Sequence, residues 1–145
     1  MIALIQRVSQ ASVTVDSKTV GDIDHGMLVL LGVEKNDDHT QIQKLVRKLS
    51  NYRLFSDEEG KMNLNIQQVQ GKILLVSQFT LVADTQKGNR PGFSRGASPE
   101  HGEAIYNDAV TALTDAGLDV ETGQFGADMQ VALVNDGPVT FQFTF

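Results

Sequence analysis

Cysteine and tryptophan are both missing from the 145 residues of this chain. Without cysteine, the chain has no disulfide framework, no thiolate nucleophile and no cysteine zinc site. No segment approaches the roughly 18 consecutive apolar residues of a membrane-spanning helix, and the short, alternating N-terminus does not resemble a signal peptide. We therefore expect a soluble cytoplasmic protein without membrane partners. Its length predicts a single domain over residues 1–145 that folds without covalent staples.

Positive charge is also scarce, because 12 Lys and Arg against 18 Asp and Glu give a net charge of −6. Proteins that grip long nucleic acids neutralise many phosphates, so this acidic chain is not expected to bind DNA. The negative net charge does not exclude a protein that binds only the end of an RNA strand. Between residues 84 and 98, Lys87, Arg90 and Arg95 form a local basic patch. The patch is either a solvated loop or a contact for phosphates.

The common hydrolase motifs are absent as well. The chain has no Gly-x-Ser-x-Gly elbow, no His-Glu-x-x-His zinc motif and no Gly-x-x-x-x-Gly-Lys phosphate loop. Its histidines, His25, His39 and His101, lie among polar neighbours where a surface role is expected. A Ser-His-Asp triad is assembled only in the fold, and no pattern favours one. We expect neither a metal nor a cofactor.

Alternating and continuous apolar runs predict a strand-rich chain. The run over residues 27–33 is apolar throughout, as in a strand covered on both faces. Residues 72–82 are typical of a central strand, and residues 16–26 and 83–97 of turns and a loop. The predicted strands span residues 1–8, 11–15, 27–33, 72–82, 119–122, 129–134 and 139–145.

Two amphipathic helices are predicted between these strands. Asp38, with Gln41 three residues later, predicts a capping box ahead of an apolar stripe that ends at Tyr52. Ser98-Pro99-Glu100 is typical of a second helix start, and Gly117 of its end. The order of strands, helix, strands, helix and strands predicts an α/β fold. Two helices cover one sheet face, so a second sheet or a partner chain must cover the other.

The last strand alternates strongly, with its apolar side chains on one face and polar ones opposite. The apolar face carries Val139, Phe141, Phe143 and Phe145. This face is either ordinary core or a contact between subunits.

Two short motifs stand out. Ser77-Gln78-Phe79-Thr80-Leu81 ends the predicted central strand, and on pattern alone it is a buried strand end. Asn135-Asp136-Gly137-Pro138-Val139-Thr140 lies between two strand-like runs. Proline lacks a donor and fixes φ, so a tight hairpin turn is the default interpretation. The bond before Pro138 can also be cis, which would direct two successive carbonyls to one side.

Together these motifs resemble those of the D-aminoacyl-tRNA deacylases of the bacterial and eukaryotic type. Further matching blocks run the length of the chain in the family's order. They are Gln6-Arg7-Val8, residues 28–33, Arg53-Leu54-Phe55-Ser56-Asp57, Gly60-Lys61-Met62-Asn63-Leu64, Lys87-Gly88-Asn89-Arg90-Pro91 and Ala127-Asp128-Met129-Gln130. Gly92 and Gly126 depart from the commoner serine and alanine. The resemblance implies a three-layer α/β/β domain, with two antiparallel or mixed sheets, two helices on one face, and strands meeting across a homodimer interface that holds the active sites.

The resemblance also implies the reaction. The enzyme would hydrolyse the ester of D-aminoacyl-tRNA, and of glycyl-tRNA mischarged on tRNA-Ala, to free amino acid and tRNA. An aminoacyl ester beside the tRNA 2′-hydroxyl needs mainly a placed water and a site for the oxyanion. We expect the N–H groups of Phe79 and Thr80 to form that site, with Ser77 in the same catalytic motif. A nucleophilic Thr80 would need a base, and none is evident.

Selection for handedness is implied for the second motif. The carbonyl oxygens of Gly137 and Pro138 would accept from the substrate ammonium and fill the space that an L side chain requires. By the resemblance, Arg7 fixes this loop of the partner subunit, Met129 lines the pocket and Gln78 seats the terminal adenosine. The basic patch would face phosphates near the tRNA 3′ end.

Two other functions fit the sequence less well. A non-catalytic module could bind RNA ends or proteins through residues 87–95. Alternatively, the chain could be a purely structural dimer built on its last strand.

Overall fold

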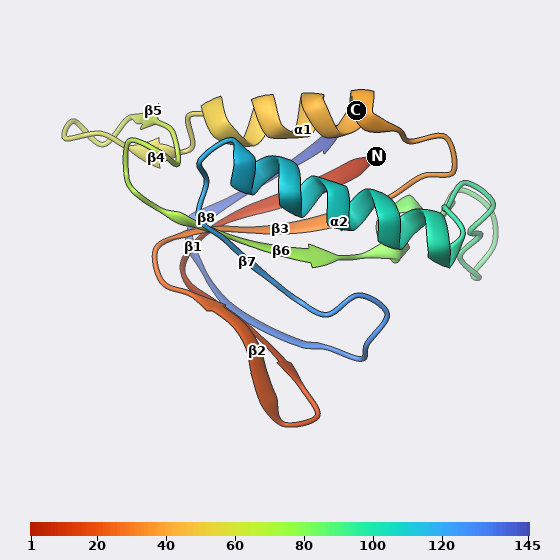
Figure 1. Cartoon of the computed structure of the whole chain (residues 1–145). Coiled ribbons are helices and arrows are strands. Elements are labelled where there is room, and N and C mark those ends of the chain that lie inside the picture. The colour runs from red at the N-terminus through yellow and green to blue at the C-terminus, as the bar shows by residue number, and fades with distance from the viewer.

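Two long strands organise the fold of this computed structural model, which covers residues 1–145. Strand β1 (Ile2–Val15) pairs antiparallel with β8 (Gln130–Thr144) along most of its length. On its other edge, the first half of β1 pairs with β3 (Gly26–Gly32) and the second half with β2 (Lys18–Ile23). Strands β1 and β8 therefore take part in two layers of one hydrogen-bonded sheet. The layer that contains β2 is the lower one in Figure 1.

The central layer is a mixed sheet. Strand β3 pairs parallel with β6 (Lys72–Ser77), and β6 pairs parallel with β7 (Val120–Thr122). The resulting order is β2-β1-β3-β6-β7, with β8 on the remaining edge of β1. A separate small hairpin joins β4 (Phe55–Ser56) to β5 (Met62–Leu64).

Both helices, α1 (His39–Asn51) and α2 (Pro99–Asp115), cover the same face of the central sheet (Figure 1). Asp38 and Gln41 form the predicted capping box of α1, and the Ser98 hydroxyl accepts from the first turn of α2. Both predicted helix starts are confirmed. Neither helix combines the length and apolarity that crossing a membrane requires.

Helix α2 is fixed to the sheet by one buried hydroxyl. Tyr106 donates to the carbonyl oxygen of Leu75 in β6 at 2.7 Å. Burial raises the pKa of this phenol to about 12, because the charged form would lose its water. Tyr106 therefore remains a neutral donor.

Two hydrophobic clusters separate the three layers. The larger fills the space between the helices and the sheet, and the smaller packs β2 and the second half of β1 against β3 and β6. Phe141, Phe143 and Phe145 are half-buried and pack against the larger cluster, where two of them meet Tyr52 edge-on. The predicted α/β class, with helices on one face and a second β layer, is confirmed.

Several predicted boundaries are wrong. Strand β6 ends at Ser77, because Phe79–Val82 form a short 3-10 turn instead of continuing the strand. The predicted break after residue 8 is only an irregularity within β1, and the predicted turn at residues 18–23 is strand β2. Gly137 and Pro138 do not close a hairpin. They lie inside β8, whose pairing with β1 shifts register there.

Candidate functional site

A pocket of about 460 Å³ lies where β3 and β6 end. Its walls come from the turn after β6, the start of α2 and the segment that precedes β8. Ser77, Gln78, Phe79 and Met129, four of the predicted site residues, line it together. Asp128 is the one ionisable residue in the lining, so the pocket offers little side-chain acid–base chemistry.

The turn after β6 presents backbone donors beside this pocket. Pairing with β3 ends where the Gln78 N–H donates to the Leu31 carbonyl oxygen at 2.8 Å. The chain then enters the 3-10 turn at Phe79. The first N–H groups of such a turn, here those of Phe79 and Thr80, have no carbonyl within the turn to donate to. Gly32 permits this close approach, since a Cβ there would lie 3.1 Å from the Gln78 carbonyl oxygen.

The hydroxyl group of Thr80 has an amide, not a base, as its hydrogen-bond partner. The Thr80 hydroxyl accepts from the side-chain amide of Gln78, which is a donor and cannot remove a proton. Thr80 is exposed and borders the pocket without being part of its lining. The role of Thr80 in the predicted catalytic motif stays a prediction.

An ion network holds the wall that contains Phe93 and Ala97. Glu34 accepts from Arg95 Nε at 3.0 Å, and its other oxygen lies 2.7 Å from the ammonium of Met1. Backbone bonds from Lys35 to Arg95 and from Ala97 to Val33 join the same segments. The hydrogen bond from the Met1 ammonium, and then that from Arg95, hold the pKa of Glu34 below its usual value, against the opposing effect of burial.

The predicted basic patch is therefore divided. Arg95 is paired with Glu34, whereas Lys87 and Arg90 are exposed on the loop before α2 and belong to none of the ion pairs of the chain.

The second motif is an irregular segment of β8. The peptide bond between Gly137 and Pro138 is cis, and Gly137 has a φ of +139°. A Cβ at Gly137 would lie 2.6 Å from Val139 Cγ2 and 3.1 Å from a guanidinium nitrogen of Arg7, so only glycine fits. The side-chain oxygen of Asn135 accepts from the Val139 N–H at 3.0 Å, so a hydrogen bond joins the two sides of the irregular segment.

Arg7 holds this segment from the neighbouring strand. Its Nε donates to the Asp136 carbonyl oxygen at 2.9 Å, and a terminal nitrogen donates to the Leu54 carbonyl oxygen at 2.9 Å. Its side chain is only 11% exposed. In the structure Arg7 binds this segment of its own chain, and the contact with a partner subunit that the resemblance implied stays a prediction.

The two motifs do not meet within one chain. Arg7 pairs with Met27, which pairs with Ile73, four residues before Ser77. With a rise of about 3.3 Å per residue and about 4.8 Å between strands, the Arg7 and Ser77 backbones lie roughly 16 Å apart. Gly137 and Pro138 are one strand further away, and neither lines the pocket.

Sequence reasoning missed part of the pocket wall. Phe93 lies 5.0 Å from Phe79 between ring centroids, and both rings are exposed, by 40% and 66%. Phe125 and the start of α2 complete the wall. A phenylalanine in a glycine- and proline-rich loop was the only available signal. No group of three or more His, Asp or Glu side chains is arranged to hold a metal ion.

Comparisons with known proteins agree on one family. The profile of the D-Tyr-tRNA(Tyr) deacylase family matches residues 4–144. Curated D-aminoacyl-tRNA deacylases of Alteromonas mediterranea and Pasteurella multocida are 71% and 65% identical, over 99% and 97% of both chains. A solved structure titled "c-Myc DNA Unwinding Element Binding Protein" is 40% identical with a TM-score of 0.94, over 100% of this chain and 99% of that one. Another, titled as a probable eukaryotic D-amino acid tRNA deacylase, is 17% identical with a TM-score of 0.87, over 98% and 97%, and shares the fold.

We predict that Glu34→Gln destabilises the protein more at pH 7 than at pH 3. The lowered pKa of Glu34 means that its ionised form stabilises the fold. This contribution is present above the ordinary value of 4.5 and is lost as the pH falls through the folded value. Urea unfolding of wild type and variant at both pH values measures the difference. The exposed Glu103→Gln is the control, and an equal loss of stability at both pH values would contradict the assignment.

Proposed function

The chain belongs to the D-Tyr-tRNA(Tyr) deacylase family, and on this premise we propose that it hydrolyses the ester bond of D-aminoacyl-tRNA to give free D-amino acid and tRNA. The observation that carries the proposal is the pocket beside the turn after β6. It combines backbone donors with a nearly uncharged lining. Such a site suits a substrate that is already activated and needs a stabilised oxyanion more than a strong base.

The proposed reaction uses water as the nucleophile. Water adds to the ester carbonyl carbon, and the N–H groups of Phe79 and Thr80 donate to the oxygen that becomes negative. The bond to the ribose oxygen then breaks, and that oxygen takes up the proton that the attacking water gives up. The neighbouring ribose hydroxyl of the tRNA lies beside the reacting carbon and can carry this proton. Gln78 and Met129 would position the terminal adenosine and the aminoacyl group.

A covalent role for Thr80 is less well supported. A threonine nucleophile needs a base within hydrogen-bond reach. Its side-chain contact is the Gln78 amide, and the only ionisable lining residue is Asp128. Backbone donation requires neither group.

We further propose that the active site is completed by a second copy of the chain. Gly137 and Pro138 cannot reach the pocket of their own chain, but they are exposed. Val131 and Val134, on the same strand, are exposed by 36% and 46%. A two-fold dimer would place the segment of each subunit against the pocket of the other.

In this arrangement the carbonyl oxygens of Gly137 and Pro138 select for handedness. They would accept from the substrate ammonium and occupy the space into which an L side chain projects. Arg7 and Asn135 hold the segment in place, so it cannot yield to the wrong enantiomer. Glycine has no side chain, so glycyl-tRNA should pass this filter.

The first test compares enantiomers of one substrate. Purified protein should release D-tyrosine from D-tyrosyl-tRNA, release glycine from glycyl-tRNA, and leave L-tyrosyl-tRNA intact, as measured by release of labelled amino acid. Equal rates on both tyrosyl-tRNAs would contradict selection by handedness. No release from any of them would contradict the proposed function.

The second test separates backbone from side chain at the 3-10 turn. Phe79→Pro removes one N–H at the first position of the turn, where proline fits. Phe79→Ala removes the same ring and keeps the N–H. We expect Phe79→Pro to lower kcat about 10²- to 10³-fold relative to Phe79→Ala. Thr80→Val, which lacks the hydroxyl, should keep substantial activity. Complete loss of activity in a folded Thr80→Val variant would instead support Thr80 as the nucleophile.

The third test asks whether one site uses two subunits. Phe79→Pro and Gly137→Ala chains, with different affinity tags, are co-expressed and the mixed dimer is purified. If the site is shared, each mixed dimer contains one site with both elements intact and regains D-tyrosyl-tRNA hydrolysis that neither homodimer has. A mixed dimer as inactive as its parents would place the site within one chain.

A further inference from the structure

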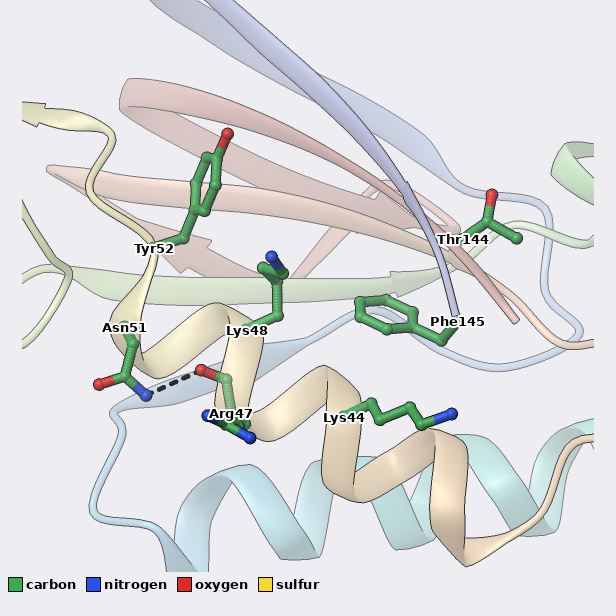
Figure 2. Close-up of a pocket in the computed structure, with 7 residues that line it drawn as sticks. All are labelled: Lys44, Arg47, Lys48, Asn51, Tyr52, Thr144 and Phe145. Atoms are coloured by element: carbon green, nitrogen blue, oxygen red, sulfur yellow. Dashed lines mark hydrogen bonds between the residues drawn. The ribbon is translucent and has the colours of Figure 1, made fainter.

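A second concave surface lies on α1, away from the pocket. It has a volume of about 710 Å³, and we call it the α1 hollow. Figure 2 shows that its lining comes from the C-terminal half of α1 and from the end of β8. The lining residues are Lys44, Arg47, Lys48, Asn51, Tyr52, Thr144 and Phe145.

The charge of the α1 hollow is opposite to that of the whole protein. Three of its seven lining residues are basic and none is acidic, in a chain of net charge −6. Helix α1 contains no Asp or Glu, and none of the ion pairs of the chain includes Lys44, Arg47 or Lys48. A cation in the last helical turn offsets the helix dipole. That explains Lys48 but not the other two.

The three cations are arranged on one face of the helix. Positions three and four residues apart are neighbours on an α-helix, with Cβ atoms about 5–6 Å apart. The Lys48 ammonium is held 5.4 Å from the Tyr52 ring centre and 5.1 Å from that of Phe143. Lys44 and Arg47 are exposed. The hollow thus has one fixed cation and two that are open to solvent.

The α1 hollow and the pocket lie at the same end of the sheet. Ser77, Leu31, Ala3 and Phe143 form one row of paired residues across β6, β3, β1 and β8. Three strand spacings of about 4.8 Å place Phe143, beside the hollow, about 14 Å from Ser77, in the pocket. A strand of RNA whose end occupies the pocket is long enough to reach the hollow.

We infer that the α1 hollow binds the sugar–phosphate backbone of the tRNA substrate, upstream of the nucleotide held in the pocket. This rests on the proposed function, which makes a polyanion the natural ligand of the chain. Unpaired lysine and arginine side chains are the usual partners of phosphate groups. The contact contributes to tRNA binding and takes no part in the chemical step.

The test measures how KM depends on salt concentration. Arg47→Gln and Lys44→Gln should each raise KM for D-tyrosyl-tRNA and lower the slope of log KM against log salt by about 1. Their kcat should remain that of wild type. Arg47→Lys retains the charge and should retain the slope. Lys18→Gln removes one exposed charge on β2, far from α1, and controls for net charge.

A short substrate distinguishes the inference from the proposed function. Hydrolysis of D-tyrosyl-adenosine, which has no upstream phosphate, should be the same for wild type and all variants. The inference is overturned if Arg47→Gln and Lys44→Gln behave like Lys18→Gln, or if they lose activity equally on both substrates. A wild-type protein inactive on both substrates would instead overturn the proposed function.

Discussion

Strand β1 is paired on both edges, and this pairing sets the distance between the two motifs. Its first half joins β3 to β8 and establishes the row in which Ser77 lies. Its second half joins β2 to β8 and forms the second layer. Arg7 lies between these halves, opposite the irregular segment of β8, where the guanidinium can reach the Asp136 carbonyl oxygen. The distance between the two motifs is therefore a consequence of strand register and cannot be changed by side-chain motion.

A site that works through main-chain groups, as proposed here, depends on the residues that fix the backbone conformation. Gly32 and Gly137 occupy positions where a Cβ would collide with neighbouring atoms. Arg7 and Asn135 use their side chains to hold carbonyl and N–H groups in place. None of these residues has the reactivity by which hydrolases are usually recognised. A search for nucleophiles, bases and metal ligands in the sequence therefore finds nothing, and the proposed site depends on main-chain groups that the fold holds in place.

What could be predicted from the sequence depended on the range of the interactions. The helix starts at Asp38 and Ser98 depend on residues three positions away and were predicted correctly. The end of β6 was predicted wrongly, because Leu81 and Val82 continue an apolar run although the backbone has left the sheet. The Gly-Pro pair favours a hairpin locally, but pairing with β1 on both sides keeps it within one strand. The bond between Glu34 and Arg95 joins residues 61 positions apart and leaves no local pattern.

The distribution of positive charge reconciles an acidic protein with an anionic substrate. Arg7, Arg95 and Lys72 are paired with acidic side chains of the chain itself. Their charge is neutralised by ion pairs within the chain, and the acidic surface would repel nucleic acid bound in arbitrary positions. The cations of α1 belong to none of the ion pairs of the chain, and they line the α1 hollow. In the proposed complex, a tRNA would contact these cations and fill the pocket together only when its 3′ end is inserted, so the same charges would add affinity and favour the productive orientation.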